Sequence, residues 1–315
     1  MAALDDVLPL LRCPTCGDAL AREGGTVRCV AGHSFDVARQ GYLSLLAGGR
    51  TAPEGDSPDM VAAREHFLDA GHFQPLATAL GDMLEHVFVG TGSIVDLGAG
   101  TGWYLARLLD RFPGAAGLAL DVSKPALRRA ARAHPRAAAV GCDAWGPLPL
   151  RDGVGGAVLN VFAPRNVAEI ARVLSLDGAA LIVTPAAQHL EELVGPLGLI
   201  GVDPHKEARL AGQIATALQL VERRDVRWRV RLDHEGAKAA AAMGPSAFHV
   251  SREELDERLE ALPQQVDVTA AVTISLATAA ARRARPPAPA AGASDPAPRR
   301  SRPASHPPRS PGDTG

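Results

Sequence analysis

SIVDLGAGTG, residues 93–102, is a short apolar run, typical of a strand, that leads directly into a glycine-rich loop. The glycines of this loop are Gly98, Gly100 and Gly102. A G-x-G-x-G loop after a strand lets the backbone approach a bound ligand closely. Asp96 precedes the loop, and a carboxylate at that point suits an ammonium group and repels a pyrophosphate. Because position 103 is Trp, the loop lacks the third glycine of the dinucleotide pattern, and S-adenosylmethionine is the favoured ligand.

The sequence around this loop alternates between apolar runs and amphipathic stretches. Strands are expected at 115–123, 137–145, 155–164 and 178–185, with helices at 103–112, 124–134 and 167–175. Such alternation predicts βαβ units on a parallel sheet, hence an α/β, Rossmann-like fold. Two further strand candidates, 224–233 and 265–279, are expected to complete one edge of the sheet as an antiparallel pair.

Acidic residues follow three successive strands of this pattern. Asp121 comes 19 residues after Gly102, where a carboxylate can accept both ribose hydroxyls of a nucleoside. Asp143 lies at the end of the third strand and could accept a hydrogen bond from an adenine amino group. A single Asp after a strand is usually a turn-former or a helix cap. Three of them at the carboxyl ends of neighbouring strands, with the glycine loop, predict a nucleoside site at the mouth of the sheet.

A second constellation lies near the N-terminus, in the pattern C-x2-C-x12-C-x3-H. Its members are Cys13, Cys16, Cys29 and His33. Four N/S donors are what a tetrahedral zinc ion requires, and a full set leaves no open position for catalysis. The pattern therefore predicts a structural Cys3His zinc site in a zinc-ribbon-like module. Cys142 has no partner in sequence and is expected to be a small buried residue.

Composition divides the 315 residues into four parts. These are a zinc-binding module (1–46), a linker and helical segment (47–90), an α/β domain with the predicted S-adenosylmethionine site (91–281) and a disordered tail rich in Pro, Ala and Arg (282–315). No apolar run reaches the roughly 18 residues of a membrane span, and the first residues are acidic rather than basic. We therefore expect a cytoplasmic protein with no membrane association.

Charge gives no support for a nucleic-acid partner at the level of the whole chain, because the formal net charge is −2. One run departs from this balance. Between Arg107 and Arg136 there are seven basic residues and two acids. A solvated helix face explains such a run as well as an RNA-binding surface does, and the sequence leaves both interpretations open.

Several longer motifs resemble one enzyme family. They are GHSFDVA (32–38), GYLSLL (41–46), GDS (55–57), AR (63–64), FLDAGHFQPL (67–76) and LDVSK (120–124). With the zinc motif and the glycine loop, they resemble the large-subunit ribosomal RNA (guanine-N1)-methyltransferases of the RlmA type. This family includes enzymes that confer resistance to tylosin-like macrolides. The resemblance covers roughly residues 8–280 and is most specific in the zinc and FLDAGHFQPL stretches.

The resemblance implies a methyltransferase domain behind a zinc-binding RNA-recognition module, and a homodimer whose cleft holds a hairpin of 23S rRNA. It also implies that Cys13, Cys16, Cys29 and His33 bind zinc. Further residues would contact the cofactor: Phe73, at a position where the family has a tyrosine or a similar aromatic residue, Gly100 and Thr101 beside its methionine part, and His189.

The chemistry of guanine N1 sets one more requirement. N1 carries a proton that must be lost, so a base would help, but the sequence assigns no catalytic residue. The segment after the fourth strand is NVFAP, residues 160–164, in which Phe162 could stack on a guanine or lie in the core. The alternatives are a methyltransferase for a small molecule, such as an antibiotic precursor, and a non-enzymatic zinc protein that binds RNA.

Overall fold

The computed structural model describes residues 2–46, 55–202, 206–244, 250 and 252–279. Residues 1–280 form one compact unit. The tail expected at 282–315 lies outside the described residues.

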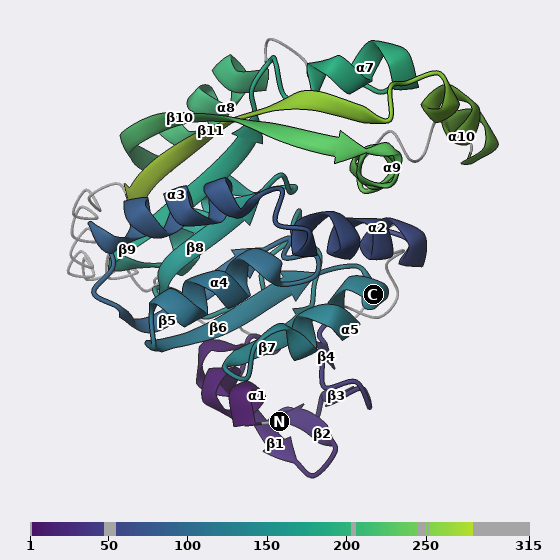
Figure 1. Cartoon of the computed structure of the whole chain (residues 1–315). Helices are drawn as coiled ribbons and strands as arrows, with labels where there is room; N and C mark the ends of the chain where they lie inside the picture. Colours follow the sequence, from purple (N-terminus) through teal and green to yellow (C-terminus); the bar gives the residue numbers. More distant parts are fainter. Residues whose placement is uncertain (1, 47–54, 203–205, 245–249, 251, 280–315) are drawn as a thin grey trace, which may run out of the picture. The chain divides into compact units, whose positions relative to one another are not determined.

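The core of this unit is an eight-stranded sheet with the strand order β10-β11-β9-β8-β5-β6-β7-β4 (Figure 1). Its strands are β4 (Leu43–Ser44), β5 (Thr91–Leu97), β6 (Gly114–Asp121), β7 (Ala137–Gly141), β8 (Gly155–Val161), β9 (Leu174–Pro185), β10 (Leu218–Asp233) and β11 (Gln265–Ala279). Neighbouring strands from β9 to β4 are parallel, whereas β11 is antiparallel to both β9 and β10. The predicted α/β fold and its antiparallel edge pair are confirmed.

Helices cover both faces of the sheet, because alternate residues of each parallel strand point into two different cores. Ile94 packs with the helices α3 (Gln74–Glu85) and α4 (Trp103–Arg111), whereas Val95 and Leu97 belong to a second core with α1 (Ala2–Val7) and α6 (Val167–Val173). The helix α5 (Lys124–Ala133) joins the first core and α8 (Lys206–Ala215) the second. Most buried residues of the parallel strands are apolar, as expected for a sheet covered on both faces.

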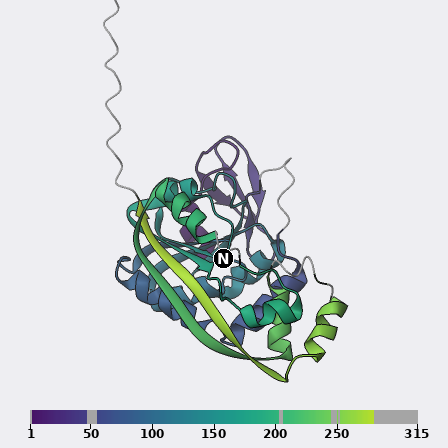
Figure 2. The same cartoon turned by 90° about the horizontal axis from the view of Figure 1, so that it is seen from above.

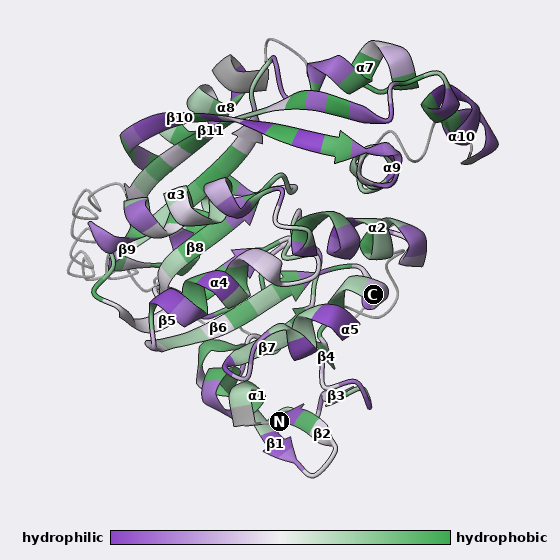
Figure 3. Cartoon of the chain, in the orientation of Figure 1, coloured by the Kyte–Doolittle hydropathy of each residue, from purple (hydrophilic) through white to green (hydrophobic). Residues whose placement is uncertain are grey.

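The antiparallel pair of β10 and β11 is the longest pair of strands, and Figure 2 shows the two strands side by side. Along β10, exposed and less exposed residues alternate, which appears as banding in Figure 3. Near this strand pair lie α7 (Glu191–Leu197) and the two helices that connect β10 to β11, α9 (His234–Ala242) and α10 (Arg252–Glu260). Trp228 of β10 packs against the core, and its Nε1 donates to the carbonyl oxygen of His72 at 2.8 Å.

The N-terminal module consists of α1, a 3-10 turn (Leu8–Leu10) and a small sheet of β1 (Leu20–Glu23), β2 (Thr26–Cys29) and β3 (Ser34–Asp36). Several contacts join it to the rest of the unit, and two of them are strand-like pairings. The short strand β4 pairs with β7, with Leu43 opposite Val140, and Leu11 forms an antiparallel bridge with Leu150. The sequence did not predict this extra edge strand, because a two-residue strand leaves no periodicity.

The segment before β5 is helical, as expected for part of residues 47–90. It forms α2 (Pro58–Asp69) and α3, separated by a short turn. The Oγ of Ser57 accepts a hydrogen bond from the amide of Met60 at 3.2 Å and caps α2. Among the described helices, none combines the length and the apolar character needed to cross a membrane.

Candidate cofactor site and zinc centre

The glycine loop after β5 adopts a backbone that requires glycine. Gly98 has a φ of 75°, and a Cβ there would lie 2.3 Å from the Cβ of Ala163, in the loop after β8. Gly100 has a φ of 56°, and its Cβ would lie 3.3 Å from Nη1 of Arg64. These glycines therefore keep the loop narrow between two neighbouring segments. Gly102, also with positive φ, is the N-cap of α4.

Asp121 at the end of β6 holds this loop in place. One of its carboxylate oxygens accepts from the amide of Gly100 and the other from the amide of Ser123, both at 2.8 Å. Each carboxylate oxygen has a further lone pair, so the group can still accept from two ribose hydroxyls. The sequence predicted the carboxylate at this point, but not its bond to the glycine loop.

Asp96 is 2% exposed, and burial together with the nearby Asp121 raises its pKa to about 7. The hydroxyl of Tyr104 is also buried, and it has no hydrogen-bond partner among the described residues. Burial raises the pKa of Tyr104, and the charges of Arg64 and Asp96 both act on it. A buried carboxyl with a raised pKa and an orphaned hydroxyl beside the loop suit a ligand that carries an ammonium and a carboxylate group.

Arg64 of α2 completes this corner, and sequence reasoning gave it no role. Its guanidinium forms an ion pair with Asp56 and donates to the carbonyl oxygen of Met243 at 2.7 Å. The carbonyl oxygen of Asp56 in turn accepts from Oγ of Ser123 at 2.7 Å. The segment from Gly55 to Arg64 thus lies against both the glycine loop and the turn after β6. The only signal in the sequence was the pair of short motifs GDS and AR.

Asp143 follows β7 and forms a turn of its own. Its Oδ1 accepts from the amide of Trp145 at 2.9 Å. The preceding residue, Cys142, is buried, and its amide donates to the carbonyl oxygen of Asp121 at 2.9 Å. The three predicted acids therefore end neighbouring strands β5, β6 and β7, in the order that the sequence suggested.

An aromatic cluster lies beyond the loop, at the carboxyl ends of β8 and β9. Phe73 is 2% exposed and meets the ring of His189 at a centroid distance of 5.8 Å and that of Trp228 at 5.4 Å. Phe162 lies 5.6 Å from His189 and 6.1 Å from Phe73, yet it is 41% exposed. The interpretation of Phe162 as a core residue is therefore wrong. Its φ of 54° is unusual for a bulky residue and holds the ring outward at the strand end.

Asn160 shapes the loop that carries Phe162, and sequence reasoning missed its role. It is fully buried, and its Nδ2 donates to the carbonyl oxygens of Leu97 at 3.0 Å and Pro164 at 2.9 Å. Its Oδ1 accepts from Nη1 of Arg165 at 3.4 Å. One amide thereby joins the ends of β5 and β8 and fixes the turn between them.

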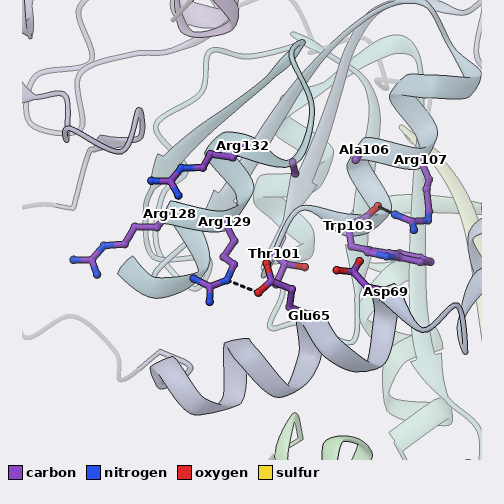
Figure 4. Close-up of a pocket in the computed structure, with 10 residues that line it drawn as sticks. Glu65, Asp69, Thr101, Trp103, Ala106, Arg107, Arg128, Arg129 and Arg132 are labelled. Atoms are coloured by element: carbon purple, nitrogen blue, oxygen red, sulfur yellow. Dashed lines mark hydrogen bonds and ion pairs between the residues drawn. The ribbon is translucent and has the colours of Figure 1, made fainter. Parts of the chain in front are cut away.

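Thr101 of the glycine loop lies at the edge of a separate hollow. It lines a hollow of about 490 Å³ between α2, α4 and α5 (Figure 4). The hollow is lined by Glu65, Asp69, Thr101, Trp103, Ala106, Arg107, Arg128, Arg129, Arg132 and Ala133. The guanidinium of Arg107 lies 3.3 Å from the ring centroid of Trp103. Four arginines and two acids make this hollow strongly polar.

The four predicted zinc ligands come together in the N-terminal module. Their ligand atoms all lie within 4.8 Å of one another. The Sγ atoms of Cys16 and Cys29 are 3.6 Å apart, and Nδ1 of His33 is 3.7 Å from Sγ of Cys13 and 3.3 Å from that of Cys29. A tetrahedral zinc ion with bonds of about 2.3 Å to sulfur and about 2.0 Å to nitrogen places its ligand atoms roughly 3.5–3.8 Å apart. The donor set fits zinc.

Known proteins resemble this chain both in the N-terminal zinc module and over most of its length. A zinc-ribbon family model described as "RlmA, N-terminal" matches residues 11–47. A Streptomyces fradiae protein named 23S rRNA (guanine(748)-N(1))-methyltransferase is 48% identical over 274 residues, which is 86% of this chain and 97% of that protein. A Micromonospora griseorubida protein, named as a candidate 23S rRNA (guanine-N(1)-)-methyltransferase, is 49% identical over 288 residues, with the same coverage. Among solved structures, a methyltransferase candidate from Bacillus halodurans has a TM-score of 0.47 and 16% identity, covering 64% of this chain and 98% of that one.

Proposed function

Because the chain belongs to the 23S rRNA (guanine-N1)-methyltransferase family, we propose that it transfers a methyl group from S-adenosylmethionine to N1 of a guanine in 23S rRNA. The observation that carries this proposal is the similarity to the Streptomyces fradiae protein over 86% of the chain. That protein is named for guanine 748, and we propose the equivalent guanine, in a hairpin loop, as the target.

We infer that the acids at the ends of β5, β6 and β7 hold the cofactor. Asp96 would bind its ammonium group, Asp121 its ribose hydroxyls and Asp143 its adenine amino group. Two observations support this assignment: burial beside Asp121 raises the pKa of the Asp96 carboxyl, and the buried hydroxyl of Tyr104 has no hydrogen-bond partner among the described residues. When bound, S-adenosylmethionine supplies an electrophilic methyl group. The backbone of the glycine loop would line the cofactor site, through Gly98, Gly100, Thr101 and Gly102.

The acceptor guanine would lie against Phe162. A base taken out of its loop needs an exposed aromatic face, and Phe162 presents one beside the buried pair Phe73 and His189. His189 contributes a donor and not a base, because its Nδ1 already accepts from the amide of Ala271 at 3.2 Å. Its remaining nitrogen, Nε2, then carries the proton and is a hydrogen-bond donor.

The other parts of the chain have supporting roles in this proposal. We propose that residues 1–46 recognise RNA, that residues 47–90 link them to the catalytic domain at 91–281, and that two copies pair into a homodimer around the rRNA hairpin. Methylation at this position would contribute to macrolide resistance. Because ribosomes reside in the cytoplasm, the protein would act there.

Primer extension on 23S rRNA transcripts tests the proposed reaction. A methyl group at guanine N1 blocks Watson–Crick pairing, so reverse transcriptase stalls at the modified base. We expect a stop that depends on protein and cofactor and that disappears when the target guanine is replaced by adenine. Mass spectrometry of the nucleosides should then show N1-methylguanine. Full read-through of the unmodified transcript after incubation would refute the proposal.

A further inference from the structure

The basic run that the sequence left unexplained lies mainly on α5. This helix buries Ala126, Leu127 and Ala130 against the sheet. On its opposite side, Lys124, Arg128 and Arg132 are all exposed. Their spacing of four residues places them in one row, about 6 Å apart along the helix axis. A row of cations at this interval matches the separation of neighbouring phosphates on one nucleic-acid strand.

The remaining arginines of the run are already engaged. Arg111 forms ion pairs with Asp82 and Glu85. Arg129 pairs with Glu65 at 2.7 Å.

Arg136 donates to three backbone carbonyl oxygens, and Arg107 stacks on a tryptophan ring. In contrast, Lys124, Arg128 and Arg132 have no carboxylate within ion-pair distance among the described residues. Figure 4 shows Arg128 and Arg132 extending from α5 in one direction, whereas Arg129 turns toward α2.

The zinc module cannot supply this charge itself. Residues 1–46 hold four arginines and five acids, which gives a formal charge of −1 before any metal is considered. Arg12, Arg22 and Arg28 each lie within 4.0 Å of a carboxylate, on Asp152, Asp5 and Glu23. Residues 124–136, by comparison, hold five basic residues and no acid. Since RNA affinity depends strongly on phosphate neutralisation, another surface must provide the cations.

The position of α5 suits that role. It contacts α2 on one side, and on the other it lies beside the chain that leaves the zinc module, where a Cβ on Gly41 would be 3.9 Å from that of Ala131 (Figure 1). Its N-terminus follows Asp121 of the cofactor site directly. An RNA strand on α5 would thus run between the zinc module and the catalytic edge of the sheet.

We propose that Lys124, Arg128 and Arg132 on α5, with the arginine-lined hollow beside them, bind the phosphate backbone of the rRNA substrate. This inference rests on the proposed function, and it names the surface that holds the RNA while the guanine is methylated. The contact is electrostatic and carries no sequence information. It provides the affinity that a chain with a net charge of −2 otherwise lacks.

The salt dependence of RNA binding tests this surface. A double variant, Arg128→Gln with Arg132→Gln, removes two cations and leaves Lys124, which is adjacent to the cofactor site, intact. The matched control is Arg151→Gln with Arg227→Gln, two exposed arginines outside α5 that lose the same charge. Binding of a fluorescent 23S rRNA hairpin is measured at several KCl concentrations in the presence of S-adenosylhomocysteine.

The affinity for RNA falls as the salt concentration rises. We expect this dependence to be weaker in the α5 variant, with the magnitude of the slope of log K against log salt reduced by about 1.5, since each phosphate contact contributes roughly 0.7–0.9. The control should keep the wild-type slope, and both variants should bind the cofactor normally. An unchanged slope in the α5 variant, or an equal change in the control, overturns the inference. Primer extension with the wild-type protein separates the two ideas, because an absent stop refutes the proposed function, whereas a stop with an unaltered slope refutes only the α5 surface.

Discussion

Nδ1 of His189 accepts a hydrogen bond from the backbone amide of Ala271 at 3.2 Å, which joins the loop after β9 to the antiparallel strand β11. The imidazole packs against the rings of both Phe73 and Phe162, which also contact each other. Burial in this cluster lowers the pKa of His189 to about 4. At neutral pH the ring is therefore uncharged, and the hydrogen bond fixes its tautomer with the proton on Nε2.

The lowered pKa of His189 predicts how the stability of the folded protein depends on pH. The pKa of His189 is about 4 in the folded protein and has its ordinary value of 6.5 in the unfolded chain. The unfolded chain therefore binds the proton more tightly. Its contribution to stability is complete above pH 6.5 and is lost as the pH falls to about 4, by at most roughly 3 kcal/mol. Urea unfolding at pH 7.5, 5.5 and 4.5 should show a smaller loss for His189→Gln than for the wild type. Parallel losses in both proteins would contradict the assignment.

The buried carboxyl of Asp96 is expected to lower the stability of the cofactor-free protein at neutral pH and above, while it is required for cofactor binding. Its pKa of about 7 lies above the ordinary value of 3.8, so its contribution favours the folded state at low pH and is lost as the pH rises from about 4 to 7. Asp96→Asn mimics the protonated form and should stabilise the cofactor-free protein at pH 8, by at most about 4 kcal/mol. The same variant should lose cofactor binding, because the ammonium partner is gone.

Thermal unfolding and calorimetric titration with S-adenosylmethionine measure the two effects on one preparation. Wild-type protein should also release protons on cofactor binding near pH 7, because an ammonium partner lowers the pKa of the carboxyl. The assignment of Asp96 fails if Asp96→Asn binds the cofactor with unchanged affinity.

Some of these residues could be found from the local sequence pattern, whereas others depend on contacts between segments that are far apart in the sequence. Asp96 and Asp121 were found because each ends a strand, and the carboxyl ends of parallel strands meet at one edge. The position of Arg64 over Gly100 was not predictable, since no local pattern links α2 to a loop 36 residues later. The environment of His189 likewise depends on Ala271, which a different strand supplies.

The exposure of Phe162 was undecided for a related reason. An aromatic residue at the end of an apolar strand has the same local sequence whether it turns inward or outward. Its positive φ depends on the turn that Asn160 closes through the carbonyl oxygens of Leu97 and Pro164. The hydrophobic pattern could define the strands, but not the turn geometry between them.

The zinc centre predicts one metal ion per chain and a clear distinction among the cysteines. Cys13→Ala should lose the metal, because three donors no longer complete the tetrahedron. Cys142→Ala is the matched control, since Cys142 is buried in the catalytic domain and is not part of the metal-binding group. Elemental analysis should find about one zinc in the wild type and the control. Equal zinc contents in all three proteins would exclude this site.

Phe162 predicts a separation between cofactor binding and RNA methylation. Phe162→Leu keeps an apolar side chain but removes the aromatic face, and stacking of one base contributes about 1–3 kcal/mol. The expected result is a loss of about 5- to 150-fold in kcat/KM for the RNA, with unchanged affinity for S-adenosylmethionine. Phe162→Tyr retains the ring and should keep most of the activity. If Phe162→Leu methylates the transcript as well as Phe162→Tyr does, the guanine does not stack on this residue, and its outward position serves only the turn after β8.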